Sequence, residues 1–233
     1  MTPAVEPLGE DAVLLRLGDT IDAGTNARVH RLAAALDSGR PGWVRDIVPA
    51  YATLAVFVDL SVMRDADDPL ARAAAWVQDT CGRRFTGEAP APMANAAGAG
   101  PMGKPAIQVP VRFGGDDGPD LAAVAEAAGL SQADATARFC APTYQVAMLG
   151  FAPGFPYLLG LDPALAMPRL DTPRTRVPAG SVAIGGAQAG VYPREGPGGW
   201  RLVGRTPLGF FDHDRDPPAL LAPGGQVRFV SAR

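Results

Sequence analysis

The sequence contains few of the residues that build metal centres and disulfide frameworks. Its 233 residues include two cysteines, Cys81 and Cys140, and two histidines, His30 and His213. These side chains are widely spaced in the sequence, so they match no zinc-binding pattern and suggest no local disulfide. Two isolated thiols are typical of a reducing compartment. We therefore expect a cytoplasmic protein without a metal site.

Charge and long apolar runs are also scarce. Only 19% of the residues are charged, the formal net charge is -3 and the sequence pI is about 5.4. An acidic chain without a Lys/Arg stripe is not typical of nucleic-acid binding. The longest apolar run, residues 47–58, is too short to cross a bilayer, and the N-terminus does not resemble a signal peptide. We expect no nucleic-acid partner and no membrane association.

The first third of the chain predicts a small α/β domain. Short apolar segments typical of strands alternate with two segments of helical periodicity. Asp68 and Pro69 are expected to begin the second helix and Gly82 to end it, with Cys81 on the buried side. The order strand, helix, strand, strand, helix predicts a ferredoxin-like α/β sandwich over residues 1–86. The expected strands are residues 12–17, 43–48 and 52–58, and the first helix has its apolar face at residues 29, 32, 33 and 36 and Gly39 as its C-terminal cap.

Residues 87–104 predict a linker, because they are rich in Ala, Gly and Pro and poor in large apolar side chains. Gly98 to Lys104 match the first part of the phosphate-binding motif G-x-x-x-x-G-K. Pro105 follows, where that motif needs Ser or Thr to hold magnesium, and proline also removes a backbone N–H. We therefore expect no nucleotide loop here.

Residues 105–233 predict a mostly antiparallel β-barrel with two small helices. Residues 107–113 alternate apolar and polar side chains, and residues 143–149 predict a second strand. Between them, Ser131 is expected to cap a helix. Three acids near the first of these helices lack the spacing of a calcium loop and indicate a turn and a helix start instead: Asp116, Asp117 and Asp120.

The most unusual segment is residues 150–212. It contains twelve Gly and nine Pro, interleaved with aromatic and aliphatic residues, which predicts short strands joined by tight turns. It also holds six Arg, no Lys and four acids, giving a local charge of +2. Arginine binds carboxylates and phosphates through paired N–H donors, so these residues predict a pocket for a small anionic substrate. The alternative is that each arginine forms an ordinary surface or structural ion pair.

Catalytic residues cannot be assigned from the sequence. Ser181 is not in a G-x-S-x-G motif and has no evident base nearby, and its hydroxyl has the alternative role of stabilising a turn. We predict substrate contacts from the side chains of Phe155, Arg169, Arg174, Arg176, Ser181, Gln188, Trp200, Arg205 and Thr206. We predict backbone contacts from Gly154, Gly185, Gly186, Gly198 and Gly199.

Three ordered blocks resemble the family of the 5-oxoprolinase B subunit, which is also labelled allophanate hydrolase subunit 1 and includes a sporulation histidine-kinase inhibitor. These blocks are FAPGFPYLLGLD (residues 151–162), PRTRVPAGSVAIGGAQAGVYP (173–193) and GPGGWRLVGRTPLGFFD (196–212). The resemblance covers nearly the whole chain. It implies an N-terminal ferredoxin-like domain followed by a cyclophilin-like β-barrel.

The resemblance also implies one component of a larger enzyme. It would act with a paralogous cyclophilin-like C subunit and a barrel-type A subunit to convert 5-oxo-L-proline to L-glutamate, using ATP with Mg at the level of the complex. Cationic groups would stabilise charge on the activated lactam oxygen. Two alternatives remain open: a non-catalytic regulator of a sensor histidine kinase, and a component of an enzyme for allophanate or a related urea-derived amide.

The sequence departs from the family pattern at several positions. Phe139 and Cys140 stand where the pattern has His-Ser, and Thr143 stands where it has Glu. Gln188-Ala189-Gly190 replaces QTG, and Gly196 replaces a Ser before PGGW. If the missing His and Glu transfer protons in the family, activity is lost or altered here. If they only shape the pocket, substrate preference is changed.

Overall fold

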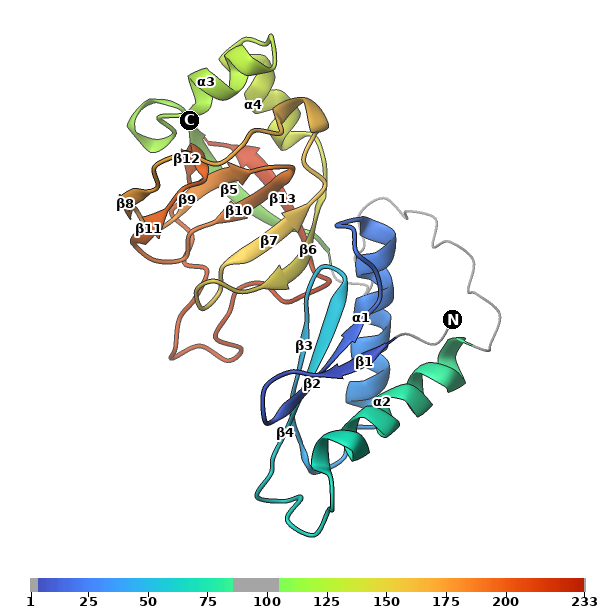
Figure 1. Cartoon of the computed structure of the whole chain (residues 1–233). Helices are drawn as coiled ribbons and strands as arrows, with labels where there is room; N and C mark the ends of the chain where they lie inside the picture. The colour runs from blue at the N-terminus through green and yellow to red at the C-terminus, as the bar shows by residue number, and fades with distance from the viewer. Residues whose placement is uncertain (1–3, 86–104, 233) are drawn as a thin grey trace. The chain divides into compact units, whose positions relative to one another are not determined.

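The computed structural model describes residues 4–85 and 105–232 (Figure 1). The chain divides into two compact units, residues 1–94 and 95–233. The predicted linker, residues 87–104, lies outside the described residues. The boundaries at residues 86 and 105 therefore stay a prediction.

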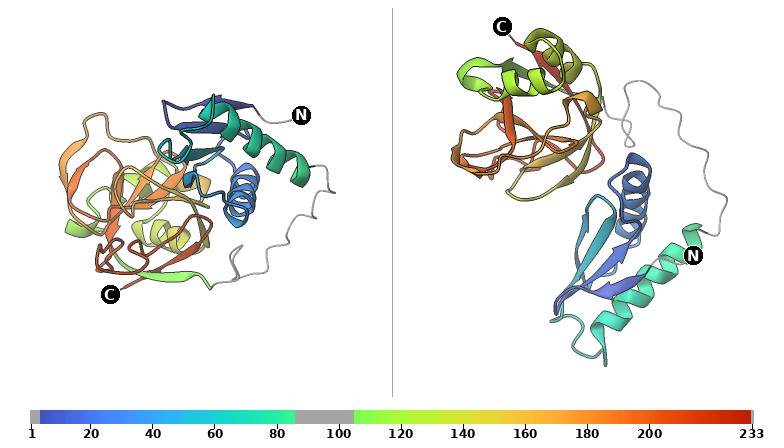
Figure 2. Two further views of the ribbon diagram at one scale, coloured as in Figure 1. Left: turned by 90° about the horizontal axis from the view of Figure 1, so that it is seen from below. Right: turned by 45° about the horizontal axis from the view of Figure 1, so that its top comes forward.

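The first unit is one antiparallel sheet with two helices packed on one face, as Figures 1 and 2 show. Its strand order is β1-β2-β4-β3. Leu15 and Val56 of the sheet and Val29 and Val77 of the helices share one buried core. The strands are β1 (Val5–Pro7), β2 (Ala12–Arg16), β3 (Val44–Pro49) and β4 (Thr53–Val58), and the helices are α1 (Ala23–Ser38) and α2 (Pro69–Phe85).

The predicted strands and helices of this unit are confirmed, with three differences. Strand β1 was not predicted, because three residues ending in proline carry little pattern. Helix α1 begins earlier than its predicted apolar face, at Ala23, because the Asp22 carboxylate accepts the Thr25 N–H at 2.8 Å and caps the first turn. Helix α2 does not end at Gly82 but continues to Phe85, since a single glycine weakens a helix without stopping it. Asp68 does cap α2, accepting the Ala71 N–H at 2.9 Å.

The second unit is built on a closed seven-stranded barrel of order β10-β7-β6-β13-β5-β12-β9. Only the β13–β5 pairing is parallel, so the predicted mostly antiparallel barrel is confirmed. A separate two-stranded ribbon pairs β8 with β11. The strands are β5 (Ile107–Phe113), β6 (Tyr144–Leu149), β7 (Pro156–Leu159), β8 (Arg174–Val177), β9 (Ser181–Gly185), β10 (Gln188–Val191), β11 (Gly196–Gly198), β12 (Arg201–Arg205) and β13 (Gln226–Ser231).

The two predicted small helices, α3 (Leu121–Ala127) and α4 (Gln132–Cys140), lie together against the barrel (Figure 1). Ser131 caps α4 by accepting the Asp134 N–H, as predicted. Short 3-10 turns occur at Gly115–Asp117 and Pro163–Leu165. The helices contribute Leu121, Val124 and Phe139 to the barrel core. The whole is an α+β chain with a barrel.

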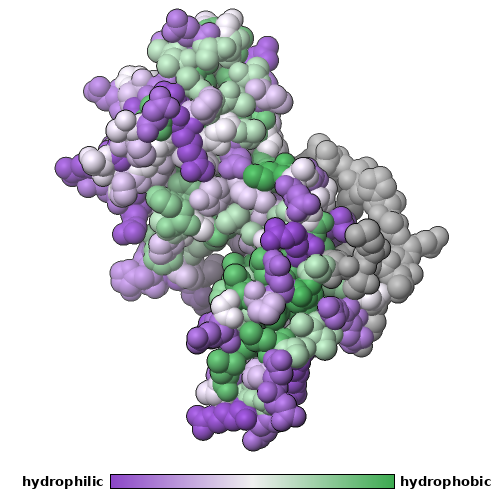
Figure 3. Space-filling model, viewed as in Figure 1, coloured by the Kyte–Doolittle hydropathy of each residue, from purple (hydrophilic) through white to green (hydrophobic). Residues whose placement is uncertain are grey.

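The surface of the first unit carries apolar side chains over its sheet in the view of Figure 3. Ile21 and Val62, which are exposed, belong to the same unit. Within the described residues, no helix has the length and apolar character needed to cross a membrane.

Candidate functional site

Five aromatic rings from the glycine-rich segment form one connected cluster, which we call the aromatic cluster: Phe151, Phe155, Tyr157, Tyr192 and Trp200. Phe155 lies at its centre, with its ring centroid 5.2 Å from Tyr192 and 5.5 Å from Trp200, both edge-on. Phe155, Tyr192 and Trp200 are buried, whereas Phe151 is 66% exposed. The prediction that aromatic residues order this segment is therefore confirmed. Phe155 and Trp200 pack in the core of this cluster. Their predicted contact with a substrate stays a prediction.

Glycines of the segment make room for these rings. A side chain at Gly185 would overlap the Trp200 ring, and one at Gly198 would overlap the Tyr192 ring. Both positions therefore need glycine for internal packing. The predicted backbone contacts to a ligand at Gly185 and Gly198 remain predictions, but the sequence pattern that suggested them has this packing explanation.

Arg174, on β8, is held by a buried carboxylate. Its Nη2 lies 2.8 Å from Oδ1 of Asp120, which is only 8% exposed, and Oδ2 of Asp120 accepts the Leu202 N–H at 2.7 Å. The Asp120 N–H in turn donates to the Leu202 carbonyl at 2.9 Å. Nη1 of Arg174 is buried and has no hydrogen-bond partner among the described residues. Asp120 thus balances the charge of this guanidinium, while the N–H donors of Nη1 are left unused within the described residues.

Two more of the nominated arginines also face acids. Arg176 pairs with Glu195 at 2.8 Å on the surface. Arg205 donates from Nε to the Ala179 carbonyl at 2.9 Å, and its Nη1 lies 4.0 Å from Asp117. The structural alternative stated for these side chains therefore has direct support, although it does not exclude a ligand.

Arg169 differs from the other nominated arginines. Its guanidinium carbon lies 5.5 Å from the centroid of the Trp200 ring, a cation–π arrangement. It makes no ion pair within the part of the chain that the structure describes. Burial raises the pKa of the neighbouring Tyr192, while the Trp200 N–H and the positive charges of Arg169 and Arg174 oppose that rise. The two arginines therefore act on the same phenol.

The predicted polar residues have local partners. The Ser181 hydroxyl is buried and donates to the Pro178 carbonyl at 2.8 Å, which is the turn-stabilising role given as its alternative. Thr206 is buried and accepts the Leu208 N–H at 3.3 Å. Gln188 begins β10 opposite Gly185 and is partly exposed. No substrate role of these three side chains is tested.

The remaining nominated glycines occupy turns. Gly154 and Gly186 have φ of 78° and 64°, which favours glycine. Gly186 exchanges two backbone hydrogen bonds with Met167, and the Gly199 carbonyl accepts the Leu170 N–H. The Gly186 N–H is therefore already used within the chain.

Phe151 is the only residue other than glycine with a positive φ, 67°, in the described ranges. An aromatic residue in this region costs on the order of 1–3 kcal/mol of strain, and such residues cluster at functional sites. Its ring centroid lies 5.4 Å from Phe155 and 6.2 Å from Tyr192, edge-on to both. The sequence gives no direct signal for this backbone conformation.

Three departures from the family pattern, Phe139, Cys140 and Thr143, lie on α4 and just after it, whereas Ala189 and Gly196 lie in β10 and β11. Phe139 is 1% exposed and packs among Phe113, Tyr144 and Phe229 in the barrel core, not in the aromatic cluster. Thr143 is exposed. Cys140 lines a surface groove of about 490 Å³, together with Phe113, Leu121, Gln132, Ala133, Thr136, Ala137, Ser231 and Ala232. Burial raises the pKa of the Cys140 thiol, and the Ser231 N–H opposes this.

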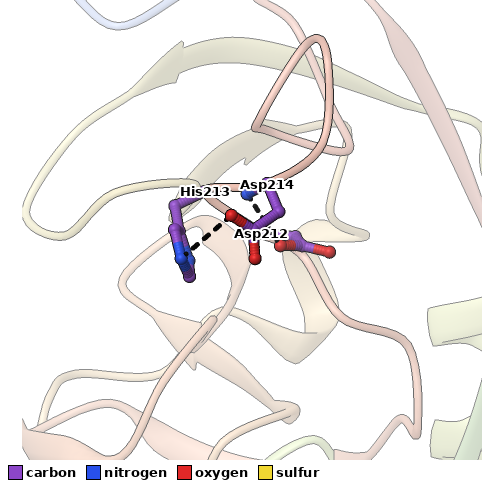
Figure 4. A group of neighbouring side chains, drawn as sticks. All are labelled: Asp212, His213 and Asp214. Atoms are coloured by element: carbon purple, nitrogen blue, oxygen red, sulfur yellow. Dashed lines mark hydrogen bonds and ion pairs between the residues drawn. The ribbon is translucent and has the colours of Figure 1, made fainter.

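An acidic loop follows Phe211. Asp212, His213 and Asp214 place three possible metal ligands within 4.8 Å of one another, and all three side chains are exposed (Figure 4). Nε2 of His213 lies 3.2 Å from Asp214, and Asp212 accepts the Asp214 N–H at 3.0 Å. These local contacts explain the arrangement without a metal ion.

Sequence reasoning missed three residues of this region. Asp120 was assigned to a helix start, although it is the partner of Arg174. Tyr192 and Phe151 were not nominated, although both belong to the aromatic cluster. The aromatic character of the segment was the available signal for the two rings. Nothing in the sequence pairs Asp120 with a residue 54 positions away.

Comparisons with known proteins place the chain among relatives of nearly the same length. The family model for the carboxyltransferase domain, subdomain C and D, matches residues 3–221. The B subunit of 5-oxoprolinase from Bacillus subtilis is 37% identical, covering 97% of this chain and 91% of the relative. The B subunit from Escherichia coli O157:H7 is 40% identical, with 96% and 93% covered.

A solved structure extends this similarity to the fold. The crystal structure of TTHA0988 matches with a TM-score of 0.74 and 35% identity over 96% of this chain. The chain spans only 40% of the TTHA0988 chain. The same fold therefore occurs within a longer polypeptide.

Proposed function

From the premise that this chain belongs to the family of the 5-oxoprolinase B subunit, we propose that it is one component of an ATP-dependent complex that converts 5-oxo-L-proline to L-glutamate. Two relatives that carry that name match it over more than nine-tenths of their length. The proposal extends to fold: the first unit is assigned as ferredoxin-like and the barrel as cyclophilin-like.

The observation that carries the proposal for the second unit is Arg169. Its guanidinium is stacked on Trp200 without a carboxylate partner in the described residues. A positive group held by an aromatic face, and not neutralised, suits a small carboxylate such as 5-oxoproline. Such a group also favours negative charge that develops on a lactam oxygen when the ring opens.

Within the complex, we assign substrate binding to this chain. Arg169, which is exposed, would bind and orient the substrate carboxylate, and the Trp200 ring beneath it would hold the guanidinium in place. We assign no proton-transfer residue to this chain. ATP with Mg belongs to the proposal at the level of the complex, and the partner chains are the paralogous C subunit and the barrel-type A subunit. A cytoplasmic location is part of the same proposal.

Reconstitution tests this function. The chain is purified with the A and C subunits, supplied with ATP, Mg and 5-oxo-L-proline, and glutamate and ADP are measured. We expect both products to depend on this chain and to fall strongly with Arg169→Ala. Arg194→Ala is the matched control, because Arg194 is exposed in the same glycine-rich segment and is not among the predicted substrate contacts. A complete, folded complex that releases no glutamate would contradict the proposal.

The same preparation separates the alternatives. Hydrolysis of allophanate by the complex, with no glutamate formed from 5-oxo-L-proline, would identify a component of an enzyme for urea-derived amides. Inhibition of sensor-kinase autophosphorylation by the chain alone would identify a regulator. Regulation of a kinase does not require a free cation at Arg169, so the Arg169→Ala variant distinguishes the regulator from the 5-oxoprolinase reaction. Allophanate is also a carboxylate, so the identity of the product, and not this variant, distinguishes an enzyme for urea-derived amides.

A further inference from the structure

The backbone conformation and the exposure of Phe151 are unfavourable for the stability of the chain itself. Its backbone is held in the left-handed region at φ 67°, which glycine would adopt with less strain, and its ring is 66% exposed. A mostly exposed ring contributes little apolar burial to folding. A strained residue with little folding benefit points to a use outside the chain.

The turn that carries Phe151 presents the ring in a fixed direction. It joins β6 to β7, and the Gly150 N–H donates to the Phe155 carbonyl at 3.1 Å while the Phe155 N–H donates to the Ala152 carbonyl at 2.9 Å. The Phe151 ring rests edge-on against Phe155 and Tyr192. A rigid aromatic side chain loses little conformational entropy when it is buried by a partner.

A second exposed phenyl ring adjoins the same turn. Gly154 has φ 78°, and a side chain there would lie 2.8 Å from Cβ of Phe211 and 2.9 Å from the Phe210 carbonyl. The turn and the Phe211 loop are therefore in direct contact. Phe211 is 39% exposed. We call Phe151, Phe211 and the intervening Gly154 the two-phenyl surface.

The border of the two-phenyl surface is acidic. Asp212 and Asp214 follow Phe211 directly, and both are exposed (Figure 4). Three aspartates against one arginine give residues 211–216 a formal charge of -2 with His213 neutral. An apolar centre with a charged rim is the usual composition of a protein–protein contact.

We propose that the two-phenyl surface docks a second polypeptide, another member of the complex, whose apolar socket receives Phe151 and whose rim is basic. This rests on the proposed function in one respect, namely that the chain works in a complex. TTHA0988 supports a polypeptide occupant, because there the same fold is part of a chain of which it makes up only 40%. In TTHA0988 the additional polypeptide belongs to the same chain. Here we propose that the corresponding polypeptide is a separate chain.

The test compares Phe151→Gly, Phe151→Ala and Phe211→Ala with the unaltered chain. Binding to the purified A and C subunits is measured by calorimetry and sedimentation, and thermal unfolding is recorded for every variant. Phe151→Gly removes the ring and also the strain, so its melting temperature should not fall. We expect it to weaken binding to the partner chains at least about tenfold, as an interface anchor does. Val62→Ala, an equally exposed apolar site in the first unit, is the control and should bind normally.

Salt gives a second readout. The acidic rim predicts that association slows as ionic strength rises, and Asp212→Asn with Asp214→Asn should reduce that dependence. A small-ligand role would instead show as loss of 5-oxoproline binding by Phe151→Gly with binding to the partner chains intact, which overturns the proposal. Self-association of the chain that Phe151→Gly abolishes would assign the surface to a second copy and also overturn it.

The outcomes for docking and for function are separable. If Phe151→Gly prevents assembly while the intact wild-type complex makes no glutamate, the docking surface stands and the 5-oxoprolinase function fails. If Phe151→Gly assembles like wild type, or if the wild-type chain binds neither partner, the docking proposal is wrong, whatever the reaction.

Discussion

Asp120 holds Arg174 from a position 54 residues earlier in the chain, with 2.8 Å between Oδ1 and Nη2. The same carboxylate accepts the Leu202 N–H at 2.7 Å, so one acid connects the start of α3, the β8–β11 ribbon and strand β12. Arg174 therefore has a structural role in addition to any contact with a ligand. Its unpartnered Nη1 lies on the other side of the same guanidinium.

The first prediction concerns this carboxylate. Asp120→Ala should lower the free energy of unfolding of the second unit by about 2–4 kcal/mol, because the Arg174 guanidinium loses its carboxylate and the buried Leu202 N–H loses its acceptor. Urea denaturation followed by Trp200 fluorescence, in a background with Trp43→Phe and Trp76→Phe, measures the change. Asp120→Asn keeps a hydrogen-bond acceptor for Leu202 and should cost less. Equal stability of the Ala variant and the wild type would show that the contact is not energetically significant.

The second prediction separates two arginines that look alike in the sequence. Arg174→Ala should destabilise the barrel, by about 1–3 kcal/mol, because it leaves Asp120 without its cation. Arg169→Ala breaks no ion pair of the described residues and should change the melting temperature by only a degree or two. In the assembled complex, Arg169→Ala should nevertheless weaken 5-oxoproline binding about tenfold or more, measured by calorimetry. Normal affinity in that variant would remove the anion site from the second unit.

The third prediction tests why the segment is rich in glycine. Gly185→Ala places a methyl group into the Trp200 ring and should cost about 1–3 kcal/mol or prevent folding of the barrel. Gly196→Ala is the matched control, because no heavy atom lies within 4 Å of its added Cβ and its φ is not positive. Both are measured by thermal unfolding. A tolerated Gly185→Ala would mean that Trp200 can move, and that the aromatic cluster is not rigid.

Much of the fold is predictable from local patterns. Alternation over residues 107–113 predicted β5, and Ser131 and Asp68 were correctly expected as helix caps. These signals act within a few residues, so the sequence shows them directly. The apolar periodicity did not show the start of α1, because the first turn is polar and only the Asp22 cap marks it.

The candidate site was only partly predictable for the opposite reason. The arginine-rich, aromatic segment was recognised, but which arginine is neutralised depends on contacts across the barrel, such as Arg205 with Asp117. Likewise, the sequence could not show that Gly198 makes room for Tyr192, since the two positions come together only when the turns form. Composition identified the region, and tertiary pairing decides the role of each side chain.

The last prediction concerns pH and the first unit. Cys81 is 1% exposed on the buried side of α2, and burial raises its pKa from 9.0 to about 11. Between these values the unfolded chain loses the thiol proton while the folded chain keeps it. The native state then binds more protons, so its stability is complete below about pH 9 and falls as pH rises towards 11, by up to about 1.4 kcal/mol per pH unit. Cys81→Ala should lower stability at pH 7 because it leaves a small cavity, but should flatten this alkaline slope in urea titrations. Val77→Ala, which leaves a cavity on the same buried side of α2 without removing a thiol, is the control and should keep the slope. An unchanged slope in Cys81→Ala would show that other groups cause the alkaline loss.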